Sequence, residues 1–208
     1  MESTERATIT EALYRTIRER RSIRRYQPRP IPRETLLRLV EAATWAPSAH
    51  NRQPWRFVIL EAGESKTLLA DTMAERLAAD LRADGVSEEA IARDTGRSRE
   101  RLTGAAALVL VCLTMADMDE YPDGRRQSFE HQMAAQGVAM AAQNLLLAAH
   151  AEGLGAVWMC APLFCQGAVR AALDLPADYE PQGVIALGWP AEERTRTRAP
   201  LETRVVFR

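Results

Sequence analysis

Lysine, cysteine and long apolar runs are scarce in this sequence, and these shortages narrow the structural features and partners that we expect. Lys66 is the only lysine among 27 basic residues, so nearly all of the positive charge is carried by arginine. The formal net charge is −1, which argues against a general nucleic-acid-binding protein, because such proteins usually carry a basic excess. No stretch reaches the roughly 20 apolar residues that span a bilayer. We therefore expect neither a nucleic-acid partner nor a membrane segment.

The few cysteines, Cys112, Cys160 and Cys165, form no C-x-x-C pair, and their number is odd. This pattern indicates neither a disulfide framework nor a metal site. We expect all three to be buried, reduced and structural, which favours a cytoplasmic location. The first 20 residues mix acidic and basic side chains without an apolar core, so we also expect no signal peptide.

Hydrophobic periodicity and turn residues predict one α+β domain over residues 1–208, with a central mixed sheet flanked by helices. Thr8, Ser65 and Ser87 are the expected N-terminal caps of three helices, and Gly153 is expected just past the end of a fourth. The helices are predicted over residues 8–20, 32–46, 65–83, 87–102, 131–152 and 163–173. The strands are predicted over residues 55–60, 107–113, 156–161 and 184–189, with a strand-like tail at 205–207.

The segment from Arg20 to Tyr26 places four arginines around one serine, directly after the first predicted helix. A phosphate monoester carries nearly two charges and several acceptor oxygens, which arginine forks and a serine hydroxyl can bind. Arg20, Ser22 and Arg24 alternate, so in an extended chain they point to one side. The cluster could equally be a solvated basic surface at a helix end, where arginine complements the dipole, or a nucleic-acid patch without interleaved aromatics.

A second polar segment runs from Pro47 to Trp55, between a predicted helix and a predicted strand. Its side chains at Ser48, Asn51 and Gln53 can donate and accept hydrogen bonds, as the edge of a flat ring system requires. An ordinary polar loop is the competing interpretation. Together with a dianion site, the loop would suit a phosphate attached to a polar-edged ring, a description that fits flavin mononucleotide (FMN).

Two further patterns lie nearer the C-terminus. Arg196 and Arg198 are separated by one residue, so in an extended chain both forks face one side and could meet the same phosphate as the first cluster. Gly153 and Gly155 permit a tight turn and the close approach of a flat ring. They are not a dinucleotide-binding fingerprint, because they follow a helix and precede a strand.

The four patterns occur in the order Arg-Arg-Ser-x-Arg, Pro-Ser-x-x-Asn-x-Gln-Pro-Trp, Gly-Leu-Gly before a strand, and Arg-x-Arg-x-Pro. In this order the sequence resembles the FMN-dependent nitroreductase superfamily over essentially its whole length. Residues 82–190 look most similar to the C-terminal reductase domain of the bifunctional coenzyme F-420 biosynthesis protein. The segment from Pro47 to Trp55 is more similar to general nitroreductases.

The resemblance implies a nitroreductase-like, intertwined homodimer with two FMN molecules at the subunit interface. Arg24 would face the pyrimidine edge of the flavin ring and stabilise the negative charge that develops there on reduction. The phosphate would be held by Arg20, Ser22, Arg196 and Arg198. Ser48, Ala49 and Asn51 would come from the partner subunit, and the backbone N–H groups of Cys160 and Ala161 would approach flavin N5. The predicted cofactor-binding set also includes Arg21, Pro47 and Gln53.

We therefore expect an FMN-dependent oxidoreductase in which hydride passes through flavin N5 and no protein side chain acts as a nucleophile. The resemblance favours reduction of a deazaflavin coenzyme precursor, with a reduced deazaflavin or NAD(P)H as the small-molecule donor. Two alternatives stay open: an NAD(P)H-dependent reductase of nitroaromatics or quinones, and a flavin-binding protein without turnover.

Overall fold

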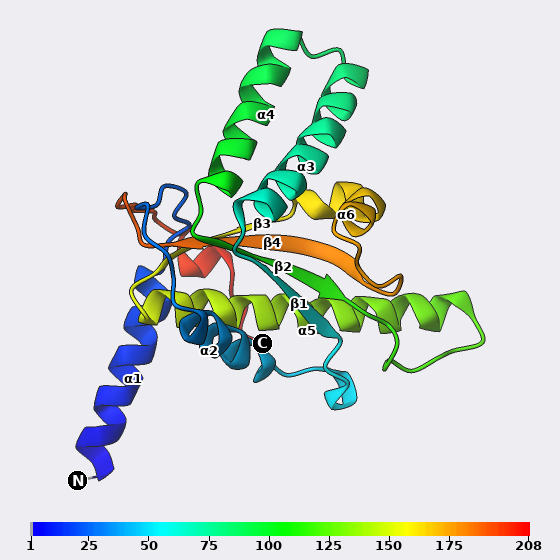
Figure 1. Cartoon of the computed structure of the whole chain (residues 1–208). Helices are drawn as coiled ribbons and strands as arrows, with labels where there is room; N and C mark the ends of the chain where they lie inside the picture. Colours follow the sequence, from blue (N-terminus) through cyan, green and yellow to red (C-terminus); the bar gives the residue numbers. More distant parts are fainter. Residues whose placement is uncertain (1) are drawn as a thin grey trace.

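The centre of the protein is a four-stranded sheet in the order β1-β2-β4-β3 (Figure 1). The computed structural model describes residues 2–208, with side chains from residue 5 onward. The strands are β1 (Trp55–Leu60), β2 (Ala107–Leu113), β3 (Gly155–Met159) and β4 (Glu180–Gly188). Neighbouring strands pair antiparallel, so the predicted mixed sheet was wrong in this detail. Within residues 2–208, parallel pairing is confined to one isolated bridge, between Ser22 and Ala156, because the short segment after the first helix runs beside β3 in the same direction.

Strand β2 is buried along its whole length, and its apolar side chains contribute to the hydrophobic clusters on both faces of the sheet. Side chains alternate between the faces of a strand. Val109 and Val111 accordingly join the cluster shared with helices α2 and α5, whereas Leu108 and Leu110 join the cluster shared with helices α3 and α6. The sheet is therefore the middle layer between two helical layers.

The first helical layer consists of α2 (Arg33–Thr44) and α5 (Gly124–Ala151), which cross the same face of the sheet (Figure 1). The predicted start of α5 at residue 131 was wrong. Asp123 caps the helix by accepting a hydrogen bond from the backbone N–H of Arg126 at 2.9 Å, and the polar first turns extend beyond the core, where no apolar periodicity marks them. Gly153 follows the helix with φ +78°, as predicted for a residue just past a helix end.

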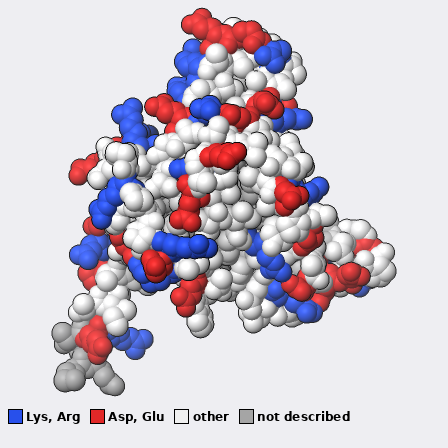
Figure 2. All heavy atoms as spheres, viewed as in Figure 1, with Lys and Arg blue, Asp and Glu red and all other residues white. Residues whose placement is uncertain are grey.

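The second helical layer contains α3 (Gly63–Ala83), α4 (Glu88–Thr103), the short 3-10 helix η2 (Ala161–Cys165) and α6 (Gln166–Ala172). Helices α3 and α4 form a hairpin that projects from the sheet (Figure 1), and charges of both signs are interspersed over it (Figure 2). Ser87 caps α4 as predicted. Ser65 does not cap α3: it lies inside the first turn, and its hydroxyl donates to the carbonyl of Ala62.

The two ends of the chain pack less closely on this core. Helix α1 (Glu2–Glu19) begins before the predicted cap at Thr8 and points away from the sheet (Figure 1). The tail holds only the 3-10 helix η3 (Leu201–Thr203). The predicted strand at 205–207 was wrong, because this segment lies exposed rather than beside a strand. Among residues 2–208, no helix combines the length and apolar content that crossing a membrane requires.

Candidate cofactor-binding site

The arginine-rich segment after α1 is fixed to one end of the sheet. The backbone N–H of Ile23 donates to the carbonyl of Ala156 at 3.0 Å, beside the Ser22–Ala156 bridge. The hydroxyl oxygen of Tyr26 lies 2.7 Å from the carbonyl oxygen of Ile23 and 3.0 Å from that of Ala186. The segment therefore lies where β3 begins and β4 ends.

Two glycines make room for this segment. A Cβ atom on Gly155 would lie 2.7 Å from a methyl group of Ile23, and one on Gly188 would lie 2.7 Å from the ring of Tyr26. Neither distance is compatible with ordinary van der Waals contact. The absence of side chains at these ends of β3 and β4 thus allows the arginine-bearing segment to lie directly on the sheet.

The segment forms one wall of a cavity of about 220 Å³, which we name the arginine pocket. It is lined by Arg20, Arg21, Ser22, Arg24, Arg194, Arg196 and Arg198. The structure therefore brings together the two arginine groups that the sequence analysis singled out, from opposite ends of the chain. Arg194 was not among the predicted residues, although it alternates with Arg196 and Arg198 in an extended tail, a pattern that indicates a shared side.

The lining of the arginine pocket is positively charged, because it consists of six arginines and one serine without an acidic residue. Burial, followed by the neighbouring charges of Arg198 and Arg21, lowers the pKa of Arg20. The Nε atom of Arg21 is buried and has no hydrogen-bond partner, an arrangement that costs free energy unless a ligand satisfies it. An anion with several acceptor oxygens would relieve the repulsion among these guanidinium groups.

Glu192, which the sequence analysis also missed, ties the two walls of the arginine pocket together. Its Oε1 atom accepts a hydrogen bond from the backbone N–H of Arg24 at 2.7 Å, and its Oε2 atom lies 2.8 Å from Nη2 of Arg194. The hydrogen bond from the Arg194 side chain is the main cause that lowers the pKa of Glu192, and the Arg24 N–H contributes. Nothing in the local sequence reveals a contact between residues this far apart in the chain.

The second predicted element, residues 47–53, is a constrained loop. It contains the 3-10 helix η1 (Ala49–Asn51), and His50, Asn51 and Gln53 have positive φ angles of 50°, 55° and 52°. Such angles are uncommon outside glycine. The loop keeps its shape because the Ser48 hydroxyl accepts a hydrogen bond from the backbone N–H of Gln53 at 3.0 Å. Strain of this kind clusters at functional sites.

This loop and the arginine pocket lie at opposite ends of the sheet. The loop leads into Trp55, which pairs with Leu113, and Leu113 pairs with Glu180 at the start of β4. The pocket instead lies by Gly155 and Gly188. A strand of six residues spans about 20 Å, and Figure 1 shows the same separation. Within one chain, therefore, the predicted site residues Pro47, Ser48, Ala49, Asn51 and Gln53 do not join the arginine cluster.

Cys160 and Ala161 are connected to the pocket by the edge strand β3. The carbonyl of Ala156 points away from β4 towards Ile23, so by alternation the backbone groups of Trp158 also point outwards.

The prediction that all three cysteines are buried was wrong for Cys160, which is exposed because it lies in the turn after β3. Cys112 and Cys165 are buried, and burial raises the pKa of Cys112 to about 12.

Comparison with known proteins identifies the family. The model of the "Nitroreductase family" matches residues 17–189, so the chain belongs to the nitroreductase family. The predicted family is confirmed, and with it a nitroreductase-like fold and membership of a family of oxidoreductases.

The relatives have more specific names. The chain is 34% identical over 175 residues to 5,6-dimethylbenzimidazole synthase of Rhodospirillum rubrum, a match covering 84% of this chain and 80% of the relative. It is 32% identical to a protein of Methanothermobacter thermautotrophicus named as an NADH dehydrogenase/NAD(P)H nitroreductase, covering 85% of this chain and 76% of that one.

The solved structures agree on the fold. A protein from Desulfovibrio desulfuricans named as a nitroreductase and solved in complex with FMN is 29% identical, with a TM-score of 0.73, covering 94% of this chain and 96% of its own. The FMN-dependent nitroreductase NfnB of Mycobacterium smegmatis, solved with NADPH, is 22% identical with a TM-score of 0.73, covering 96% of this chain and 99% of its own.

Proposed function

We propose that this protein is an FMN-dependent oxidoreductase in which the arginine pocket holds the phosphate of FMN. The observation that carries the proposal is a pocket of arginines and one serine with no carboxylate in its lining. The Ser22 hydroxyl in the lining adds a neutral donor to the guanidinium groups. These groups fit a phosphate dianion, and the D. desulfuricans relative was solved with FMN.

The remaining predicted residues extend the site along β3. Arg24 lines the arginine pocket, and in this proposal it stabilises negative charge on the pyrimidine side of the ring. Cys160 and Ala161 follow the end of β3, so in this proposal their backbone N–H groups approach the flavin ring away from its pyrimidine side, near N5. When bound, FMN supplies hydride transfer through its N5 atom. The role of this chain is to bind and orient the cofactor and to balance its charge.

The protein works as a homodimer in this proposal. The loop at residues 47–53 is too far from the arginine pocket to contact the same FMN within one chain, so a partner subunit must supply it. Helix α1 carries exposed apolar side chains at Ile9, Leu13 and Ile17, which are spaced on one helix face. An apolar stripe of this kind marks an interaction surface.

For the electron donor we propose NAD(P)H, with a nitroaromatic or quinone as acceptor. The M. smegmatis neighbour was solved with NADPH, and the M. thermautotrophicus relative is named as an NAD(P)H nitroreductase. Reduction of a deazaflavin coenzyme precursor, supported by the sequence resemblance over residues 82–190, is the second candidate. Oxidation of NADPH by the purified protein with a nitroaromatic acceptor would favour the first, and turnover only with a reduced deazaflavin would favour the second. Flavin binding without either reaction would indicate a flavin-binding protein without turnover.

The test of the cofactor site is the affinity for FMN. We expect the purified protein to be yellow, and Arg196→Ala together with Arg198→Ala to weaken FMN binding at least about 100-fold, because each charge-assisted hydrogen bond contributes about 1.5–3 kcal/mol. Titration of the apoprotein with FMN, followed by flavin fluorescence, measures this. Arg204→Ala, in the same tail but outside the pocket, is the control. A colourless protein that ignores added FMN would contradict the function, and an unchanged affinity in the double variant would contradict the phosphate assignment.

A further inference from the structure

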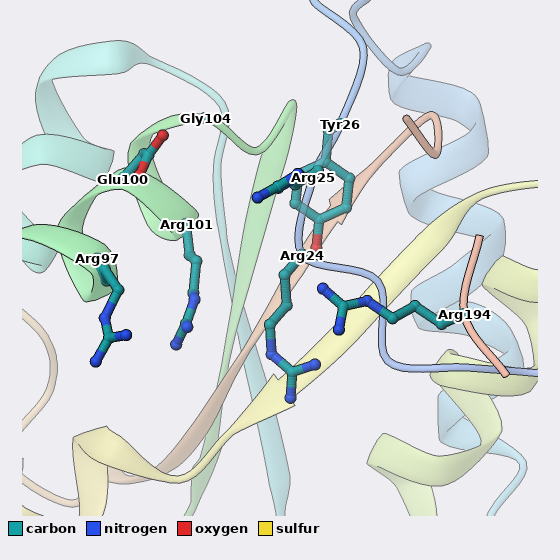
Figure 3. Close-up of a pocket in the computed structure, with 8 residues that line it drawn as sticks. All are labelled: Arg24, Arg25, Tyr26, Arg97, Glu100, Arg101, Gly104 and Arg194. Carbon is teal, nitrogen blue, oxygen red and sulfur yellow. The ribbon is translucent and has the colours of Figure 1, made fainter. Parts of the chain in front are cut away.

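A second basic cavity lies beside the arginine pocket, between the segment after α1 and the base of α4. Its volume is about 310 Å³, and we name it the hairpin pocket (Figure 3). It is lined by Arg24, Arg25, Tyr26, Arg97, Glu100, Arg101, Gly104 and Arg194. Arg24 and Arg194 line both cavities, so the two pockets adjoin and share a wall.

The helical spacing of α4 explains why its side chains converge here. Arg97 and Arg101 are four residues apart and Gly104 three further on, so all three lie on one helix face. Figure 3 shows the guanidinium groups of Arg97, Arg101 and Arg24 extending towards the same side. Gly104 keeps the end of the helix clear, since it has no side chain. The pocket faces the C-terminal end of α4, where the helix dipole is negative, so any attraction for an anion comes from the arginine side chains.

The positive charge in the hairpin pocket is only partly neutralised. Asp94 pairs with Arg97, and Glu192 pairs with Arg194. Among the side chains that the structure describes, no ion pair neutralises Arg25 or Arg101. The carboxylate of Glu100 is the only acidic group in the lining, and Figure 3 shows it directed to the opposite side from the guanidinium groups of Arg97 and Arg101. Burial raises the pKa of the Tyr26 hydroxyl, so this ring adds no negative charge.

The negative charge of one FMN phosphate is too small to balance the arginines that line the two cavities. Together the two pockets are lined by nine arginines, whereas a phosphate monoester carries at most two negative charges. Arg25, Arg97 and Arg101 do not line the arginine pocket. They therefore form a separate group of donors, suited to the bidentate binding of a second phosphate.

We propose, building on the FMN function above, that the hairpin pocket binds a phosphate group of the second small molecule in the reaction, the electron donor or acceptor. Arg97 and Arg101 are then specificity-determining residues that select a phosphorylated substrate. The projecting α3–α4 hairpin contributes to the active site by carrying these two arginines to its base. A phosphate bound there would lie next to the FMN phosphate, separated from it by the shared Arg24 and Arg194.

The experiment uses FMN-saturated protein and inorganic pyrophosphate as the probe, titrated by calorimetry at low ionic strength. We expect binding that weakens with added salt and that falls at least about 10-fold in the double variant Arg97→Gln, Arg101→Gln. That factor corresponds to about 1.4 kcal/mol. Arg93→Gln, on the same helix but outside the pocket, should bind pyrophosphate like the wild type. Circular dichroism and the flavin spectrum should be unchanged in every variant, because these side chains lie on the outside of α4.

A kinetic measurement then identifies the source of the phosphate. If the double variant raises KM for NADPH at least about 10-fold and leaves KM for NADH unchanged, the pocket binds the 2′-phosphate. If it raises KM for both donors, the pocket binds the diphosphate that the two donors share. Pyrophosphate binding that is insensitive to Arg97 and Arg101, or that only displaces FMN, overturns the proposal. Absence of FMN from the protein would instead contradict the proposed function, so the two failures are distinguishable.

Discussion

At the scale of single residues, Glu192 has a larger structural role than its place in a charged tail indicates. Its carboxylate contacts both walls of the arginine pocket, through the Arg24 N–H and the Arg194 guanidinium. It is also largely buried, since its side chain is only 11% exposed. A buried carboxylate with two such donors stabilises the pocket in its open, positively charged shape without entering it.

We predict that Glu192→Gln destabilises the protein in a pH-dependent manner. In the folded protein the hydrogen bond from Arg194 lowers the pKa of Glu192 below its ordinary value of 4.5. A lowered carboxyl pKa contributes stability above pH 4.5 that is lost as the pH falls through the folded value. At pH 7 the variant should lose about 1–3 kcal/mol, measured by urea unfolding, and the difference from wild type should shrink towards pH 3.

The neighbouring Glu193 provides the control, because it is exposed. Glu193→Gln should change the free energy of unfolding by less than about 0.5 kcal/mol. Equal losses in the two variants, or a loss in Glu192→Gln that does not vary with pH, would show that the ion pair does not support the pocket.

At the scale of elements, the site depends on how one irregular segment lies against two strand ends. The segment from Arg20 to Tyr26 has a single bridge at each end, to Ala156 and to Pro190. Side-chain packing, with Ile23 against Gly155 and Tyr26 against Gly188, therefore adds to the few hydrogen bonds that set its position. Because adjacent residues carry the arginines, a small displacement of this segment would move the phosphate-binding groups.

We predict that Gly188→Ala weakens both folding and FMN binding. The new methyl group would overlap the Tyr26 ring, and overpacking of this kind costs about 1–3 kcal/mol. Thermal unfolding and FMN titration measure the two effects. Gly96→Ala is the matched control: Gly96 lies in α4 with nothing near its Cβ position, and alanine there should stabilise the helix by up to about 1 kcal/mol. A Gly188→Ala protein with wild-type stability and FMN affinity would show that the segment is not positioned by this contact.

A comparison of the predicted elements with those in the structure shows which elements the sequence could predict. Strands β1 and β2 have the predicted bounds, because an apolar run flanked by turns is a local signal. The start of α5 was missed because its first turns are polar and lie outside the core. The two arginine groups were predicted from their spacing, whereas Glu192 and the hairpin pocket were not. The contact between Arg24 and Glu192 and the hairpin pocket that Arg24 and Arg101 both line depend on how distant segments meet, and no local pattern encodes this.

At the scale of the whole molecule, several apolar surfaces remain uncovered in the single chain. Leu13 on α1 is 53% exposed, and Phe207 in the tail is 94% exposed. Both segments extend from the ends of a chain whose core is otherwise closely packed. Together with a strained polar loop at the end of the sheet remote from the arginine pocket, they are the surfaces that the proposed homodimer would cover.

We predict that Leu13→Glu with Ile17→Glu converts the dimer into monomers and abolishes tight FMN binding. These residues lie on one face of α1 and are already exposed in the single chain, so each subunit should still fold, which circular dichroism checks. Two buried carboxylates at an interface would be strongly unfavourable. Analytical ultracentrifugation measures the mass, and FMN titration measures the affinity. Arg15→Glu, about 200° around the helix from Leu13, is the control and should stay dimeric.

The affinities of the monomer for inorganic phosphate and for FMN separate the roles of the arginine pocket and the polar loop. The pocket is complete within one chain, so a monomer should keep a weak affinity for inorganic phosphate that still depends on Arg196 and Arg198. The ring-binding loop would be lost with the partner, so the affinity for FMN should fall much further than the affinity for phosphate. A monomer that binds FMN as tightly as the dimer would mean that residues 47–53 do not serve the flavin of the neighbouring subunit. The long separation between the loop and the arginine pocket would then need a different explanation.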